Sequence, residues 1–197
     1  MRTQHRGSIG KRSEFAYFNS AGAQPGSNLA GPKTRRVMRA SRVKDFLDTN
    51  RIHYSSITHP TSYTAQGTAA YAHVSGKEMA KTVIVRIDSQ LAMVVLAASA
   101  QLDLASLKKT TKAKSVSLAP EPEFEFKFPD CDLGAMPPFG NLYGMAVYVD
   151  EFLTYDKEIA FNAGSHSELV RMNYEDFERV VNPIVGHFAL AAIRTSA

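Results

Sequence analysis

The chain shows two kinds of hydrophobic spacing, one helical and one alternating. Over residues 42–51, Val43, Phe46 and Leu47 recur at three- and four-residue intervals, which predicts an amphipathic helix with Ser41 as its N-cap. An alanine-rich run predicts a second helix over residues 64–72. Two capping residues, Asp103 and Asn173, predict one helix over residues 103–109 and another from Asn173 onward.

Short runs rich in β-branched residues predict strands between these helices. The runs 80–87 and 91–98 are separated only by Asp88-Ser89-Gln90, which is typical of a hairpin. Further strands are predicted over residues 52–58, 115–118, 145–149, 159–163 and 166–172. This order of elements indicates an α+β fold, a single domain with a curved, mixed, barrel-like β-sheet and helices packed outside it.

Positive charge is concentrated near the N-terminus. Residues 1–42 hold nine lysines and arginines and one acid, Glu14, which leaves fourteen basic and eighteen acidic residues in the remainder, a net charge of −4. The overall net charge of +4 therefore describes the tail and not the body. The tail shows no sustained hydrophobic period, so we expect residues 1–38 to be disordered and residues 39–197 to form the folded domain.

Three interpretations of this tail stay open. Translation starts at Met38, which we favour, or the tail is a basic arm that holds RNA, or it is an organelle transit peptide. The chain has no apolar run long enough to cross a bilayer, and one cysteine, Cys131, excludes an intramolecular disulfide. We therefore expect a cytoplasmic protein that does not bind a membrane.

The most constrained segment is Gly134-Ala135-Met136-Pro137-Pro138-Phe139-Gly140. The terminal glycines permit a positive φ or a close backbone approach, and the two prolines fix φ and remove N–H donors. Such a loop presents backbone carbonyls and amides to a ligand without first being ordered. Lys81, on a predicted strand, shares its side of the strand with apolar residues, so its amine either reaches solvent or lines a cavity.

These pieces, in their order, resemble the YbaK/ProX-type aminoacyl-tRNA deacylases, which hydrolyse amino acids wrongly attached to tRNA. The resemblance covers about residues 41–181. It depends on His59-Pro60 and the residues after it, on Lys81, on the Gly-x-x-x-Pro pair Gly134 and Pro138, and on Ala163-Gly164-Ser165-His166. The family loop often carries Gly-Gly or Ser at its centre, where this chain has Ala135, Met136 and Pro137.

The resemblance implies roles for particular residues. Lys81 would hold the terminal adenosine or its phosphate, the main chain from Gly134 to Pro138 would bind the aminoacyl group, and His166 would act as a base for an attacking water. We expect the substrate-binding residues to be Tyr63, Thr64, Met136, Pro137, Gly164 and Ser165. No Gly-x-Ser-x-Gly elbow surrounds Ser165, so it is not predicted to be a nucleophile.

The expected function is hydrolysis of the aminoacyl ester of a mischarged tRNA by a free-standing editing enzyme. The alternative is a binding module for aminoacyl-tRNA 3′ ends or aminoacyl-nucleotides, which acts as a sensor or as a synthetase partner. The tRNA 3′ end is the expected partner, with a synthetase as a second one, and crowding by Met136 and Pro137 suggests a small amino acid such as alanine. Scattered histidines and the lack of nucleotide-binding glycine motifs predict no metal and no cofactor.

Cys131 is flanked by Asp130 and Asp132. Two neighbouring carboxylates raise the pKa of a thiol, because they disfavour a second negative charge. We therefore expect Cys131 not to serve as a thiolate nucleophile.

Overall fold

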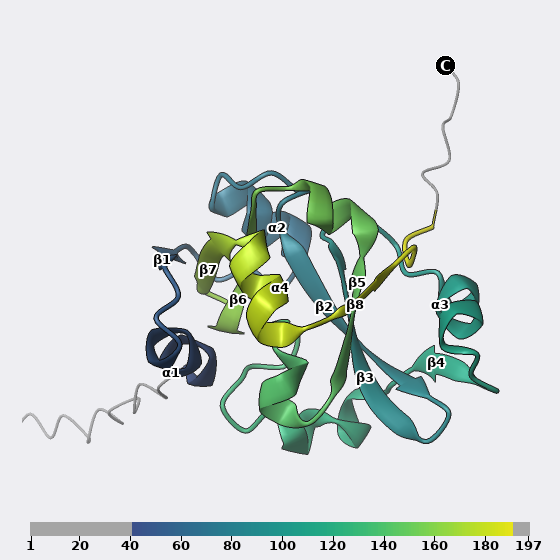
Figure 1. Cartoon of the computed structure of the whole chain (residues 1–197). Coiled ribbons are helices and arrows are strands. Elements are labelled where there is room, and N and C mark those ends of the chain that lie inside the picture. Colours follow the sequence, from purple (N-terminus) through teal and green to yellow (C-terminus); the bar gives the residue numbers. More distant parts are fainter. Residues whose placement is uncertain (1–40, 191–197) are drawn as a thin grey trace, which may run out of the picture. The chain divides into compact units, whose positions relative to one another are not determined.

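Eight strands form two sheets within residues 41–190, the part of the chain that the computed structural model describes (Figure 1). The smaller sheet is antiparallel, in the order β1-β7-β6. Its strands are β1 (Tyr54–Thr58), β6 (Glu158–Ser165) and β7 (Glu168–Asn173). The basic tail, residues 1–38, lies outside the described residues.

The larger sheet is mixed and has the order β4-β2-β3-β5-β8. β2 pairs antiparallel with β3 and β4, whereas β5 is parallel to both β3 and β8. The strands are β2 (Ala80–Ile87), β3 (Gln90–Ala97), β4 (Val116–Leu118), β5 (Ala146–Asp150) and β8 (Ile184–Gly186).

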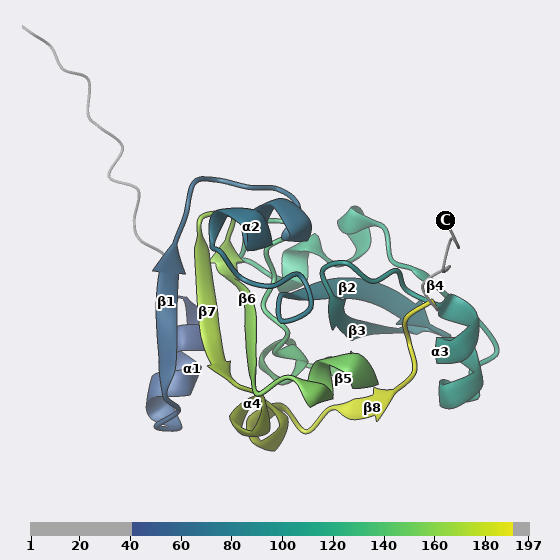
Figure 2. The ribbon, with the colours of Figure 1, turned by 90° about the horizontal axis from the view of Figure 1, so that it is seen from above.

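The predicted α+β domain with a mixed sheet is confirmed. The two sheets lie side by side (Figure 2) and are connected by an isolated parallel bridge between Met79 and Ala160. Within residues 41–190 they do not close into a complete barrel. In this described part of the chain, the four α-helices are α1 (Arg42–Thr49), α2 (Ala65–Tyr71), α3 (Leu104–Thr111) and α4 (Tyr174–Val181). None of the helices in residues 41–190 has the length and apolar character that a membrane span requires.

Side-chain capping explains where three of these helices begin. Thr64, Asp103 and Asn173 each accept a hydrogen bond from a backbone N–H in the first turn of α2, α3 and α4. Ser41 precedes α1 as predicted, but its hydroxyl makes no capping bond and donates to the carbonyl of Ala163 at 2.8 Å. The Ser41 hydroxyl therefore fixes α1 to the end of β6.

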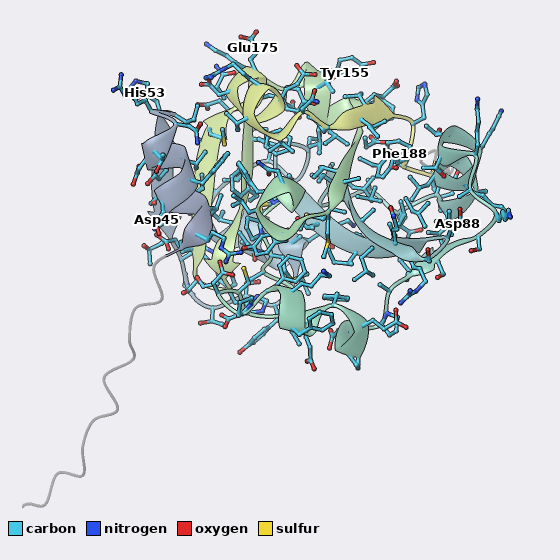
Figure 3. All side chains as sticks on the ribbon, turned by 60° about the horizontal axis from the view of Figure 1, so that its bottom comes forward. Asp45, His53, Asp88, Tyr155, Glu175 and Phe188 are labelled. Atoms are coloured by element: carbon cyan, nitrogen blue, oxygen red, sulfur yellow. The ribbon has the colours of Figure 1, made fainter. Side chains whose placement is uncertain are left out.

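The main core lies between the two sheets and contains buried residues from α1, α4 and the strands of both sheets. Phe139 is fully buried at its centre, with ring centroids 5.9 Å from Phe46, 5.4 Å from Phe161 and 5.5 Å from Phe177. On the opposite face of the larger sheet, Leu107 of α3 packs with Phe188 in a separate cluster. Phe188 is fully buried, whereas Tyr155 is exposed (Figure 3).

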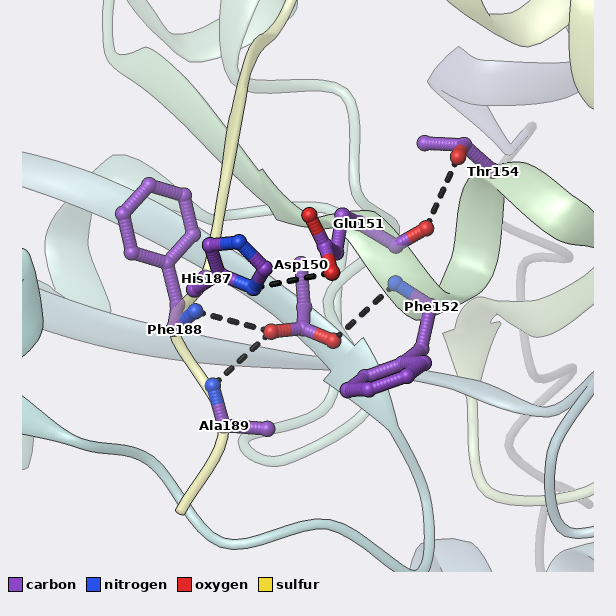
Figure 4. A network of polar contacts seen from close by, with 7 residues as sticks. All are labelled: Asp150, Glu151, Phe152, Thr154, His187, Phe188 and Ala189. Carbon is purple, nitrogen blue, oxygen red and sulfur yellow. Dashed lines mark hydrogen bonds and ion pairs between the residues drawn. The ribbon is translucent and has the colours of Figure 1, made fainter. Parts of the chain in front are cut away.

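A buried carboxylate holds the segment after β8 in place (Figure 4). Asp150, at the end of β5, is only 1% exposed and accepts hydrogen bonds from the backbone N–H groups of Phe188 and Ala189, both at 2.8 Å. Its other oxygen accepts from the N–H of Phe152 at 3.2 Å. Three backbone donors satisfy this buried charge, which keeps Phe188 against the sheet.

Several elements were not predicted from the sequence. The hydrophobic pattern did not predict β8 or the four short 3₁₀ helices found in residues 41–190. The strands and helices that it did predict begin and end within a few residues of the predicted bounds. The 3₁₀ helices are η1 (Glu121–Glu123), η2 (Glu125–Lys127), η3 (Gly140–Tyr143) and η4 (Glu151–Tyr155).

Candidate functional site

Three segments that are far apart in the sequence meet at one end of the smaller sheet: residues 59–64, 131–136 and 162–167. The N–H of Ser62 donates to the carbonyl of His166 at 3.0 Å, and the N–H of Gly164 donates to the carbonyl of Ala135 at 3.1 Å. The rings of Tyr63 and His166 are 4.8 Å apart. The structure thus brings together the predicted segments around Tyr63, Gly134, Gly164 and His166, and we call this cluster the loop site.

Both terminal glycines of the predicted loop are required, each for one of the two expected reasons. Gly134 has φ +83°, and a Cβ there would lie 3.4 Å from Cε1 of His166. At Gly140, a Cβ would lie 2.6 Å from the carbonyl oxygen of Met145. The first glycine therefore provides a positive φ beside His166, and the second permits a close backbone approach.

The exposed residues of this region lie just before the loop and at its first glycine. Asp132, Leu133 and Gly134 are exposed, whereas Met136, Pro137 and Pro138 are buried. The Met136 sulfur accepts a weak hydrogen bond from the N–H of Gly134 at 3.2 Å. The surface that this loop offers to a ligand is accordingly the Asp132–Gly134 backbone, and the side chains of Met136 and Pro137 lie beneath it.

His166 is held by one ring nitrogen. Its Nε2 lies 2.8 Å from the carbonyl of Leu133. Because a carbonyl oxygen only accepts, Nε2 carries the proton in this contact, and in the neutral ring Nδ1 is the hydrogen-bond acceptor. Nδ1 is buried and has no hydrogen-bond partner among the described residues.

Further buried polar atoms in the three segments, or next to them in the chain, have no hydrogen-bond partner among the described residues. They include Nε2 of His59, Oδ1 of Asp130 and Oδ1 of Asn162. Buried polar groups are normally hydrogen-bonded, so each of these atoms could take a hydrogen bond from a water or a ligand. Within residues 41–190, no three His, Cys, Asp or Glu side chains gather in a way that could hold a metal ion.

Tyr63, Thr64 and Ser165 occupy different positions around the loop site. Tyr63 is 78% exposed, and its ring packs against the His166 ring in a tilted arrangement. Thr64 caps α2 by accepting from the N–H of Gly67 at 3.1 Å. Ser165 is half-buried at the end of β6, after an irregularity in its pairing with β7. Of the three, Tyr63 offers the largest surface to a ligand.

Lys81 lies at the start of β2 and is half-buried. Its Nζ donates to the carbonyl of Ala98 at 3.2 Å and also to that of Ala100. Desolvation by burial lowers the pKa of Lys81 below its usual value. Since an ammonium has three donors, one N–H is left for a further partner.

Lys81 and the buried part of the loop lie on opposite faces of β2. Met136 and Phe139 share the main core with Ala80 and Ile84, whose side chains leave the strand on the other side from Lys81. Among the hydrogen bonds of residues 41–190, none joins Lys81 to the loop or to His166. The predicted site residues thus fall into two groups, the loop site and Lys81 with its two carbonyls.

The sequence interpretation missed a polar group beside Gly164. The hydroxyl of Tyr143 donates to Oδ2 of Asp130 at 3.1 Å and lies 3.3 Å from Sγ of Cys131. Arg42 from α1 lies over the Tyr143 ring, 5.3 Å from its centroid. The sequence carries no signal for this group, because Tyr143 belongs to a 3₁₀ helix that was not predicted.

Alkylation of Cys131 is expected to be slow up to about pH 9 and to accelerate only near pH 11. Burial raises the pKa of this thiol to about 11, with smaller contributions from Asp130 and Asp132. The folded state therefore binds the proton more tightly, and this contribution to stability is lost as the pH rises from about 9 to about 11. The pKa of the thiol is measured from the rate of iodoacetamide labelling as a function of pH, with the urea-unfolded chain as the control. Rapid labelling of the folded protein at pH 8 would contradict the raised pKa.

A cavity of about 540 Å³ opens elsewhere, at the end of the β2–β3 hairpin. It is lined by hairpin residues, by Glu123 and Lys127, and by residues 144–146, and Arg86 within it forms an ion pair with Glu123. It shares no lining residue with the loop site or with Lys81. The cavity therefore gives no support to the predicted site residues.

The fold and the loop site define a mixed α+β domain with a surface site built from loops. Residues 59–180 match the model of the aminoacyl-tRNA editing domain. Because this match covers more than half of the chain, the protein belongs to the aminoacyl-tRNA editing domain family, which confirms the resemblance seen in the sequence. No curated protein sequence matches the chain significantly.

Two solved structures have the same fold. One is the hypothetical protein APE2540, with 20% identity and a TM-score of 0.68 over 75% of this chain and 99% of that one. The other is described as a candidate trans-editing enzyme for prolyl-tRNA synthetase, with 20% identity and a TM-score of 0.68 over 78% of this chain and 98% of that one. At this level of identity, the similarity establishes the fold alone.

Proposed function

We propose that this protein hydrolyses the aminoacyl ester of a mischarged tRNA as a free-standing editing enzyme. The observation that carries the proposal is the loop site, in which Gly134, Tyr63 and His166 from three distant segments meet in a chain of the aminoacyl-tRNA editing family. Residues 39–197 would form the editing domain, with residues 1–38 preceding it. A cytoplasmic location is part of this proposal.

The aminoacyl group would bind at the exposed start of the loop. Among residues 41–190, the N–H of Gly134 donates only to the Met136 sulfur, a weak acceptor. It would therefore be available to a carbonyl oxygen that becomes negative as the ester is attacked. Tyr63 presents an exposed ring on which a nucleobase can stack.

Water would be the nucleophile, with His166 as its base. Nε2 donates to the carbonyl of Leu133 and keeps Nδ1 as an acceptor in the neutral ring. Because Nδ1 is buried, the loops around it would first have to move to admit a water. That water would then lose its proton to the ring as its oxygen attacks the ester carbon. The ring would then return the proton to the departing ribose oxygen.

Lys81 would act on the nucleotide rather than on the reacting carbon. Two of its N–H groups are held by the carbonyls of Ala98 and Ala100, and the third would bind the phosphate or the ribose of the terminal adenosine. The two carbonyls fix the direction of the ammonium, and no carboxylate of residues 41–190 pairs with it, so its charge would be available to an anionic ligand.

A panel of aminoacyl-tRNAs tests the proposal. Under single-turnover conditions, at least one small aminoacyl ester, with alanine as the first candidate, is expected to be hydrolysed well above its spontaneous rate. A pocket separates side chains that differ by one methylene by only about 1–3 kcal/mol, so we expect activity on neighbouring small residues also. Saturable binding without hydrolysis across the whole panel would contradict an enzyme and favour a binding module, either a sensor or a partner of a synthetase.

A further inference from the structure

Four exposed lysines lie within seven residues at the end of α3 and in the turn that follows it. We call Lys108, Lys109, Lys112 and Lys114 the lysine patch. None of them takes part in the ion pairs found among residues 41–190. The patch stands on a body, residues 43–197, whose net charge is −4.

The acids of the adjoining segments are occupied by the backbone. Asp103 caps the start of α3 by accepting from the N–H groups of Ala105 and Ser106, at 2.9 and 3.1 Å. Asp88, in the β2–β3 turn (Figure 3), accepts a hydrogen bond from the N–H of Ser115 at 2.9 Å. Neither carboxylate forms an ion pair with the patch, so the four ammonium groups remain available to an anionic partner.

The topology places the patch at the opposite end of β2 from Lys81. α3 follows Ala100, whose carbonyl accepts from Lys81, and it ends before β4, which pairs with Val85–Ile87 at the far end of β2. A strand of eight residues spans about 26 Å at ~3.3 Å per residue. The patch therefore lies on the order of 20 Å from Lys81, well beyond the reach of a single nucleotide.

We propose that the lysine patch binds the phosphate backbone of the double-stranded part of a tRNA whose 3′ end occupies the proposed site. The identity of this partner rests on the proposed function. Duplex nucleic acid carries one negative charge per ~1.7 Å of its axis, so a stem leading away from the 3′ end offers several phosphates to four adjacent lysines. Such contacts hold the stem without reading its sequence.

The test is the binding of uncharged tRNA to the full chain. It is measured by fluorescence anisotropy over a range of salt concentrations. Replacing all four lysines with glutamine is expected to weaken binding at least tenfold at low salt. The slope of log K against log salt is expected to become shallower by about one for each lysine that contacts a phosphate. Equal affinity and an equal salt slope for the variant and the wild type would overturn the proposal, as would wild-type protein that binds no tRNA.

A matched pair of double variants separates the patch from a general effect of charge. Lys108→Gln with Lys112→Gln removes two positive charges from the patch, and Lys77→Gln with Lys157→Gln removes two from exposed positions elsewhere. Only the first is expected to reduce tRNA affinity, by threefold or more. Equal losses in both would contradict a local site, and a patch that instead binds an acidic protein would leave both tRNA affinities unchanged.

A short substrate distinguishes failure of this inference from failure of the proposed function. The aminoacyl ester of the terminal CCA trinucleotide lacks the stem, so the four-lysine variant is expected to hydrolyse it at the wild-type rate while its kcat/KM on whole aminoacyl-tRNA falls tenfold. An equal fall on both substrates would overturn the role of the patch. If neither protein hydrolyses either substrate, the proposed function fails, and the anisotropy measurement still decides whether the patch binds tRNA.

Discussion

Replacing Lys81 with alanine is expected to lower the kcat/KM of deacylation by about ten- to a hundredfold, the effect of losing one charge-assisted hydrogen bond to the nucleotide, worth about 1.5–3 kcal/mol. The variant loses the ammonium that the carbonyls of Ala98 and Ala100 hold in a fixed direction. Its stability should change little, by about 1 kcal/mol, because the lost hydrogen bonds are offset by relief of the desolvation that lowers the pKa of this amine.

Lys77→Ala is the matched control, since Lys77 is an exposed lysine shortly before β2. It should retain the wild-type rate. Rates on aminoacyl-tRNA and melting temperatures of both variants give the comparison. Full activity in Lys81→Ala would remove Lys81 from the proposed mechanism, and a large drop in its melting temperature would indicate a structural role instead.

Replacing Phe139 with alanine is expected to cost about 3–5 kcal/mol of unfolding free energy, the usual range for a buried phenylalanine. Phe139 is fully buried and contacts aromatic rings of α1, β6 and α4. It also belongs to the segment between Gly134 and Gly140, so its loss should loosen the backbone of the loop site. Urea unfolding monitored by circular dichroism measures the effect.

Phe126→Ala provides the comparison, because this ring is 68% exposed and lies outside the core. Its unfolding free energy should stay within about 0.5 kcal/mol of the wild type. A loss below about 1 kcal/mol for Phe139→Ala would mean that the core closes around the missing ring and that the loop does not depend on it.

The regular elements could be predicted from the sequence because their patterns are local. The run 80–87 coincides with β2, since β-branched residues and a following turn are enough to define a hairpin strand. β8 could not be predicted, because only three residues form it and its position depends on β5 and on Asp150, which lies 38 residues before Phe188.

The loop site was predictable in part for the same reason. Glycine at both ends of the segment signals special backbone geometry, and Gly134 and Gly140 have it. The separation of Lys81 from the loop depends on which face of β2 each one occupies, and no local pattern determines that. The Asp130–Tyr143 contact likewise depends on a 3₁₀ turn without a sequence signal.

The Asp150 network has a consequence for the extent of the folding unit. The family match ends at residue 180, yet the buried carboxylate of Asp150 accepts hydrogen bonds from the backbone N–H groups of Phe188 and Ala189. The helix α1 lies before the match altogether. A fragment cut to the matched segment would leave the Asp150 carboxylate without those donors and would uncover the face of the larger sheet that Phe188 covers. The segment that matches the family model is therefore shorter than the piece of chain that packs around this core.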